Sequence, residues 1–287
     1  MQHTLWQATI KFGRPGQSKT DDELSEHLTD TFHTGKKALK AVKQLWGNSL
    51  DELGSCERKA RKFHKNTTFD GIGDIRVCVE AEREKWLATM EEYAAAYRAL
   101  ARQWLDNYDI WLEQERYDKN GAFRIEDYPC RESLASKFRV HFAILPMPEP
   151  NAFVRDALTD ELGKRLANDY ETRLQNTTAQ ISRTVLDTLL GLIGETAESL
   201  ANDGPIVDSE NRKGPLAKLQ EYLDRIPALN ITGDPTIAAI AEQARTKLAY
   251  SANALRKNQQ TRQLASIHAT NIALQFGASS RKIAKAA

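Results

Sequence analysis

The chain has 287 residues, of which 41% are hydrophobic and 28% are charged, a balance that excludes an intrinsically disordered protein. A chain of this length can bury a substantial core in one large domain or two ordinary ones. The formal charge of +1 excludes a strong overall attraction to nucleic acid or anionic lipid, so any such contact must come from local clusters.

Two segments predict β-strands. Residues 5–12 alternate so that Trp6 and Ile10 share a face, and residues 138–144 alternate in the same way before the proline-rich 146–150. We expect the two strands to pair. Because two strands alone are marginal in water, their apolar faces should lie against a helix.

Helices are expected between these strands. Residues 21–31 and 35–53 predict short helices, and residues 57–65 predict a strongly basic one. A long helix should follow from about 74 to 117 and end near Asn120.

Large apolar residues recur along this long helix at heptad spacing, which predicts a coiled-coil seam. Asn107 interrupts the series, and further apolar positions widen the stripe, which favours packing inside a bundle. The seam consists of Trp86, Met90, Tyr93, Tyr97, Leu100, Trp104 and Trp111.

The C-terminal half predicts further helices. Residues 153–201 form a second long helix with an average apolar spacing near 3.7, so little left-handed supercoiling is expected. Its apolar window, 185–194, is about half as long as a membrane span, so we interpret it as buried and not transmembrane. A short helix at 216–226 precedes a last long helix from Pro235, capped by Asp234, to about Phe276, with Gly277 ending it.

These patterns together predict a mainly α fold: an elongated bundle of long antiparallel, coiled-coil-like helices with a small two-stranded β element. Residues 1–150 would hold both strands, the basic helices and the heptad helix. Residues 151–287 would form a helical region that packs on the first and ends in a basic segment. Self-association through the seam stays open.

No catalytic constellation stands out. Gly71–Asp74 lacks the remaining residues of a phosphate loop, and the six histidines are too scattered for a zinc site. The carboxylates Glu91, Glu92, Glu113 and Glu115 fall on the side of the helix that should face solvent. We therefore expect a protein without enzymatic activity, metal or cofactor. Three distant cysteines without a CxxC motif favour a reduced, cytoplasmic environment.

Basic clusters are the main polar feature. One lies in the predicted helix 35–53, a second in 57–65, and a third at the C-terminus, where every charged residue after Glu242 is positive. The functional interpretation is contact with phosphates or an acidic partner, and the alternative is solvated helix ends that favour the helix dipole. The candidate interaction surface comprises Lys36, Lys37, Lys40, Lys43, Arg58, Arg61, Lys62, Arg256, Lys257, Arg281 and Lys282.

Several segments in order resemble a phage- and prophage-associated family of uncharacterised function, over residues 5–155. They are Ile10-Lys-Phe-Gly-Arg14, Thr34-Gly-Lys-Lys-Ala-Leu39, Cys56-Glu-Arg-Lys-Ala-Arg-Lys62, the Phe-Asp-Gly turn at 69–71 and Phe138-Arg-Val-His-Phe142. Genes of that family often lie beside a MoxR/CobS-type AAA+ ATPase. The resemblance implies a non-enzymatic companion of such an ATPase in a bacterial cytoplasm, and it transfers no site residues.

Three hypotheses follow. The first is a phage-type helical adaptor or scaffold that acts with an AAA+ ATPase or another macromolecule. The second is a nucleic-acid-binding accessory protein of phage recombination or replication, although the aromatic residues that would stack on bases are assigned to the seam. The third is a helical-bundle toxin or membrane-active protein that exposes the patch at 185–193.

Overall fold

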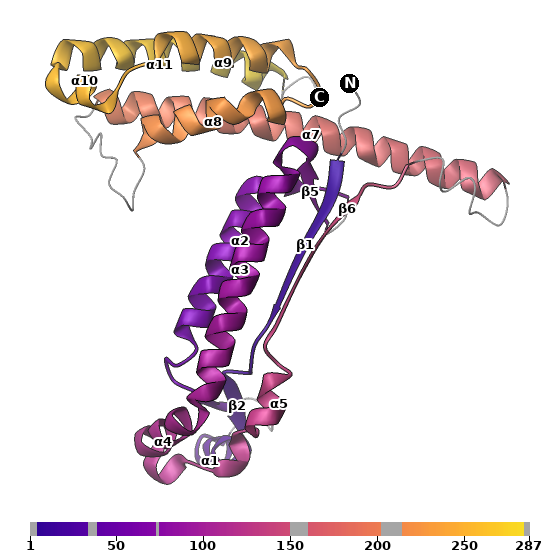
Figure 1. Ribbon diagram of the computed structural model, residues 1–287, viewed down its shortest axis with the longest axis vertical. Coiled ribbons are helices and arrows are strands. Elements are labelled where there is room, and N and C mark those ends of the chain that lie inside the picture. The colour runs from indigo at the N-terminus through magenta and orange to yellow at the C-terminus, as the bar shows by residue number, and fades with distance from the viewer. Residues whose placement is uncertain (1–4, 34–38, 73–74, 150–159, 202–213, 284–287) are drawn as a thin grey trace.

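The computed structural model describes residues 5–33, 39–72, 75–149, 160–201 and 214–283. They form a T (Figure 1). The stalk contains a β-sheet and two helices from residues 5–13, 51–72, 75–106 and 139–146. The crossbar contains the C-terminal helices, residues 160–201 and 214–283. A distal lobe, residues 18–33, 39–50 and 108–135, lies at the far end of the stalk.

The stalk sheet has four antiparallel strands in the order β4-β5-β1-β6. The predicted strands are β1, Leu5–Gly13, and β6, Arg139–Pro146, and they pair as expected from Trp6 opposite Pro146 to Gly13 opposite Arg139. The prediction of only two strands was wrong, because β4, Phe69–Asp70, and β5, Arg76–Val79, extend the sheet. These strands are too short to show an alternating pattern.

Helix α2, Asp51–Thr67, contains the predicted basic segment, and α3, Glu80–Asp106, runs beside it (Figure 1). The apolar stripe of α3 packs on two different neighbours. Trp86 and Met90 contact sheet residues such as Ala8, whereas Tyr97 and Trp104 pack with Leu53 of α2. In the described residues α3 therefore does not form the expected coiled coil with another long helix, because its wide stripe is buried by a sheet and a shorter helix.

The predicted helix 74–117 begins only at Glu80, because residues 76–79 form β5, and it is interrupted at Asn107, where the heptad series also breaks. Asn107 lies between α3 and α4, Tyr108–Lys119, and its side-chain amide donates to the Gln103 carbonyl oxygen at 2.9 Å. The backbone N–H of Asn107 donates to the same oxygen at 3.2 Å, so the Gln103 carbonyl accepts two bonds from the residue that ends α3. The end of α4 agrees with prediction, since Asn120 adopts a positive φ of 43°.

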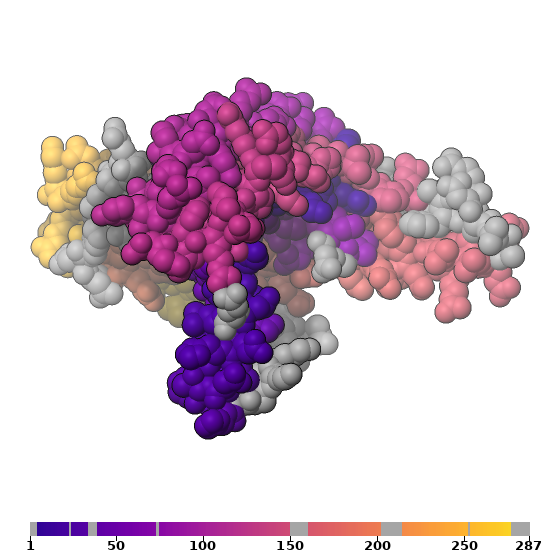
Figure 2. Space-filling model, turned by 90° about the horizontal axis from the view of Figure 1, so that it is seen from below, coloured from indigo at the N-terminus to yellow at the C-terminus, as the bar shows by residue number. Residues whose placement is uncertain are grey.

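The prediction of a helix at 35–53 was wrong, because part of this segment forms a strand of the distal lobe. Residues 34–38 lie outside the described residues, and β3, Ala41–Gln44, pairs antiparallel with β2, Ser18–Asp21. The predicted helix 21–31 is confirmed as α1, Asp22–Thr31, and the Asp21 carboxylate accepts from the Leu24 N–H at 3.1 Å. The 3₁₀ turns η1, Asn120–Ala122, and η2, Ile125–Asp127, and helix α5, Arg131–Ala135, complete the lobe. Figure 2 views this end, where the indigo residues of the lobe project to one side.

The crossbar is built on α7, Asp160–Ala201, which agrees with the predicted helix 153–201 except for 153–159, which lie outside the described residues. The predicted short helix 216–226 is α8, Pro215–Leu229. The predicted last helix was wrong in its continuity, because the chain forms α9, Pro235–Lys247, α10, Ala252–Lys257, and α11, Gln259–Ile283. Asp234 caps α9 as expected, but Gly277 does not end α11.

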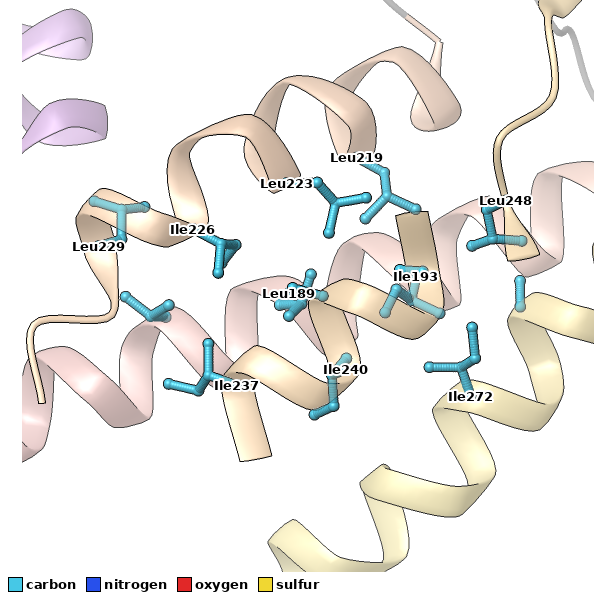
Figure 3. Packing of buried hydrophobic residues seen from close by; sticks show 14 of the residues in the cluster. Leu189, Ile193, Leu219, Leu223, Ile226, Leu229, Ile237, Ile240, Leu248 and Ile272 are labelled. Atoms are coloured by element: carbon cyan, nitrogen blue, oxygen red, sulfur yellow. The ribbon is translucent and has the colours of Figure 1, made fainter. Parts of the chain in front are cut away.

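The main core lies between α7 and the helices that cover it (Figure 3). The apolar window 185–194 supplies Val185, Leu189 and Ile193, each 0% exposed. The stalk contributes Leu5, Val77 and Val79 to the same cluster. Among the described residues, no helix is both long enough and apolar enough to cross a membrane. Facing side chains in Figure 3 are Leu219, Leu223, Ile226, Leu229, Ile237, Ile240, Leu248 and Ile272.

An ion pair also joins stalk and crossbar. Arg225 of α8 donates through Nε to Glu82 of α3 at 2.8 Å, and the Glu82 side chain is only 6% exposed. A buried carboxylate needs such a partner, because a lone buried charge is strongly destabilising. This pair therefore helps to fix the crossbar on the stalk.

Candidate interaction surfaces

The first predicted basic cluster does not form a helical face. Lys36 and Lys37 lie outside the described residues, and Lys40 is exposed just before β3. Lys43 lies within β3 with its side chain only 10% exposed. Its ammonium group lies 2.7 Å from Asp127 and 3.7 Å from Asp21, so it connects β3 to other parts of the lobe.

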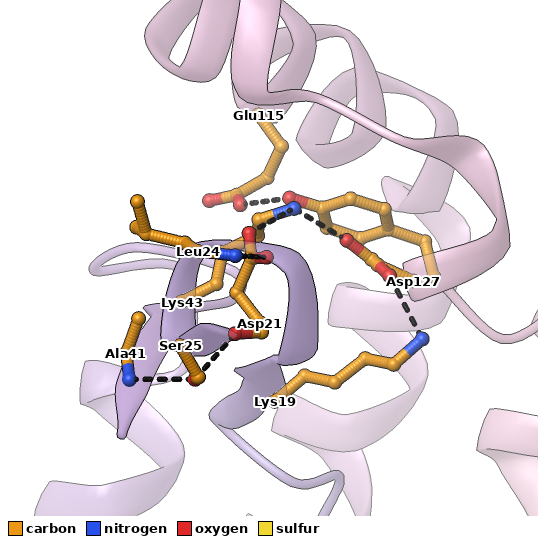
Figure 4. A network of polar contacts seen from close by, with 9 residues as sticks. Lys19, Asp21, Leu24, Ser25, Ala41, Lys43, Glu115 and Asp127 are labelled. Atoms are coloured by element: carbon orange, nitrogen blue, oxygen red, sulfur yellow. Dashed lines mark hydrogen bonds and ion pairs between the residues drawn. The ribbon is translucent and has the colours of Figure 1, made fainter. Parts of the chain in front are cut away.

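Asp127 is the centre of this polar network (Figure 4). It accepts from Lys19 at 2.8 Å through one oxygen and from Lys43 at 2.7 Å through the other. These hydrogen bonds, that from Lys19 first, lower the pKa of the Asp127 carboxyl below its usual value. The network joins β2 and β3 to η2, and Lys43 therefore serves the structure of the lobe.

The second cluster lies on one face of α2. Arg58, Lys59, Lys62 and Lys65 are exposed and follow helical spacing, while Arg61 donates to Glu57 one turn away at 2.9 Å. The other side of α2 is buried through Leu53, Cys56 and Ala60, so the basic side chains project from the side that is not packed against the stalk. We call Arg58, Lys59, Lys62 and Lys65 the α2 basic face.

A groove of about 670 Å³ continues this face into the junction with the crossbar. Lys65 lines it, with basic residues from β5, α3 and α8. Two of these are paired, because Arg76 binds Asp70 and Arg225 binds Glu82. The charged residues of the groove are Lys65, Asp70, Arg76, Lys85, Lys218, Glu221 and Arg225.

The third cluster lies on a different arm. Arg256 and Lys257 are exposed in α10, at one end of the crossbar and apart from the stalk that contains α2 (Figure 1). The side chains of Arg281 and Lys282 lie outside the described ones. Arg262 donates to the carbonyl oxygens of Ser199 and Leu200, both at 3.0 Å. These are open carbonyls at the end of α7, so part of the basic C-terminal segment caps another helix.

A cavity of about 440 Å³ lies where the distal lobe meets the stalk, and the sequence did not indicate it. The break at Asn107 places α4 beside the turn at 46–49, and Trp46, Trp104 and Trp111 line the space between them. The Trp104 indole donates to Ser49 Oγ at 3.0 Å, while the buried Trp111 Nε1 has no hydrogen-bond partner.

Carboxylates from two helices line the same cavity. They are Glu52 of α2 and Glu115 and Asp118 of α4. Glu115 was predicted to face solvent, but it is 3% exposed and accepts a hydrogen bond from the Tyr128 hydroxyl at 2.7 Å. Burial, followed by this hydrogen bond, raises the pKa of the Tyr128 hydroxyl. The prediction failed because helical periodicity cannot show that the loop at 120–130 folds over α4.

The backbone beside the cavity has an uncommon conformation. Trp46 has a φ of 67° and Gly47 a φ of 43°. Positive φ is a rare conformation for a bulky residue and persists only where the surroundings hold it. The Trp46 ring centroid lies 5.0 Å from the rings of both Trp104 and Tyr128, in edge-to-face contacts that fix the indole.

The remaining sequence motifs have structural positions. Gly71 follows β4 and precedes β5. The expectation that the fragment at 71–74 leads directly into a helix was therefore wrong, and residues 73–74 lie outside the described residues. Glu91 and Glu92 are exposed, as predicted. Across the described part of the chain, no three His, Cys, Asp or Glu side chains gather into a group that would hold a metal ion.

Comparison with known proteins gives no family assignment: no protein-family model matches the chain, and no curated protein or solved structure was found to be similar.

Proposed function

We propose that the protein is a non-enzymatic helical adaptor or scaffold that binds macromolecular partners through its distal lobe and through α11. The observation that carries this proposal is the position of the exposed apolar side chains. Phe32 and Tyr117 in the distal lobe are 64% and 81% exposed, and Ile267 and Leu274 on α11 are 55% and 67% exposed. Single exposed apolar residues are ordinary, but groups of them mark contact sites.

The distal lobe carries half of the large exposed apolar residues. Ile110, Glu113 and Tyr117 lie on one open face of α4. The apolar side chains of the lobe are Leu24, Phe32, Val42, Ile110, Tyr117 and Ile125, six of twelve in the described residues. Because α4 is already packed through Tyr108 and Glu115, its open face is available to a partner.

The proposed partner is a MoxR/CobS-type AAA+ ATPase, and its support is the family resemblance of residues 5–155. The experiment is co-purification of the tagged protein with the ATPase of this type from the same genome, with and without ATP. We expect retention that is lost in Ile110→Glu/Tyr117→Glu and kept in Leu162→Glu/Leu166→Glu, a matched pair of exposed apolar residues on α7. No association of the unaltered protein in either condition would refute this partner.

A second candidate function is nucleic-acid binding, favoured by the α2 basic face and its continuation into the groove. Phosphate contacts need positive charge and little sequence precision, and their affinity falls steeply with salt. Lys59→Glu/Lys62→Glu should abolish the retardation of DNA at low salt, whereas Arg256→Glu/Lys257→Glu on the other arm should leave it intact. Absence of retardation of single- and double-stranded DNA by the unaltered protein would exclude this function.

A further inference from the structure

The cavity between α2, α3 and α4 combines the two features that recognise organic cations. Three tryptophan side chains line it, of which Trp111 is the most exposed, and an indole ring attracts cations through the negative face of its π-system. Three carboxylates line it as well, whereas no lysine or arginine lines it among the residues that the structure describes. The carboxylates disfavour an anion and attract a cation.

The carboxylates differ in the charge that they offer. Glu115 is shared with the Tyr128 hydroxyl and with Lys119, whose ammonium lies 3.8 Å away, so part of its charge is compensated. Glu52 and Asp118 are exposed, and Asp118 accepts from the Gln114 amide at 2.9 Å, a neutral partner. The uncompensated negative charge therefore lies with Glu52 and Asp118.

Two of the three tryptophan side chains that line the cavity are held in place by contacts within the protein. Trp46 is 2% exposed and makes edge-to-face contacts with Trp104 and Tyr128, and the Trp104 indole donates a hydrogen bond to Ser49. A rigid wall loses little side-chain entropy on binding, which favours affinity. Trp111, whose ring is only partly buried, keeps an unpaired indole N–H at this wall, a donor that the described residues do not use.

We propose that this cavity binds a small organic cation, an alkylammonium or guanidinium group. Its volume of about 440 Å³ is within the range of small-molecule sites and exceeds what one such group needs. The group belongs either to a free amine or to a lysine or arginine side chain of a peptide. This site is distinct from the open face of α4 at Ile110 and Tyr117, although Gln114 borders both, so binding of a cation does not depend on the proposed adaptor function.

Binding is tested by titrating the protein with choline, spermidine and N-acetyl-arginine amide, and with 3,3-dimethylbutanol as the uncharged counterpart of choline. Tryptophan fluorescence and isothermal calorimetry report binding, since three of the five tryptophans line the cavity. We expect saturable binding of at least one cation and none of the alcohol. Tighter binding of the arginine derivative than of spermidine identifies a peptide side chain as ligand, and the reverse order identifies a free amine.

The matched variants are Glu52→Gln/Asp118→Asn and Glu91→Gln/Glu92→Gln, which remove equal charge from exposed positions inside and outside the cavity. The first should weaken cation binding about tenfold and the second should leave it unchanged. Both keep the volume of the side chains, and circular dichroism verifies folding. The proposal is overturned if no cation binds up to about 10 mM, if the alcohol binds equally well, or if both variants bind like the unaltered protein.

Discussion

His64 should make the stability of the stalk depend on pH. It lies on the inner side of α2, 8% exposed, and its Nδ1 accepts a hydrogen bond from the Trp86 indole at 3.1 Å. Burial, followed by the charges of Arg76 and Arg61, lowers the pKa of His64 from 6.5 to about 4. A proton on Nδ1 would also break the bond to Trp86, so the folded state favours the neutral ring.

The direction in which the free energy of unfolding changes with pH follows from proton binding. Between pH 6.5 and 4 the unfolded chain binds a proton at this histidine and the folded chain does not, so the free energy of unfolding falls as the pH falls. The stabilisation is fully present above pH 6.5, and His64 alone should remove about 2 kcal/mol between pH 7.5 and pH 5.

The measurement is urea denaturation of the unaltered protein and of His64→Gln at these two pH values. Glutamine can accept the Trp86 hydrogen bond but does not titrate, so the variant should lose about 2 kcal/mol less than the unaltered protein on acidification. His27→Gln, at an exposed position of α1, should behave like the unaltered protein. Equal losses in His64→Gln and the unaltered protein would refute the reasoning.

Three further predictions concern stability, each measured by urea denaturation at pH 7.5. Lys43→Ala should lower the free energy of unfolding by about 3 kcal/mol, because it removes the buried cation between Asp21 and Asp127. The control Lys40→Ala, at an exposed position, should lower it by less than about 0.5 kcal/mol. Equal losses would contradict a structural role for Lys43. Leu189→Ala, at a fully buried position of the crossbar, should cost about 3 kcal/mol, and a near-neutral result would mean that the core is not packed as described. Gly71→Ala places a Cβ 2.7 Å from the Ile75 carbonyl oxygen and should cost about 2 kcal/mol; a stabilised variant would exclude this turn geometry.

Long periodic segments were predicted well from sequence because a single element determines their pattern. The apolar series of α7 and the Asp234-Pro235 start of α9 are local signals, and both agree with the structure in the described residues. The pairing of β1 with β6 was also predicted, since both strands alternate over enough residues to show which face is apolar.

The failures involve tertiary contacts. The apolar stripe of α3 does not reveal whether a helix or a sheet will cover it, and the sheet was underestimated because β4 has only two residues. The buried state of Glu115 depends on Tyr128, thirteen residues away. The cavity depends on the break at Asn107 and on the positive φ of Trp46, which no heptad pattern encodes.

Helix α7 has a mechanical consequence for any partner. Its 42 residues span about 63 Å at 1.5 Å per residue, and the stalk joins near Ile181. The end of the helix at Asp160 lies about 30 Å from this junction, so a rotation of about 10° there would displace that end by about 5 Å. The Glu82–Arg225 pair lies at this junction, so the angle between stalk and crossbar, and with it the position of the tip, depends in part on one buried ion pair.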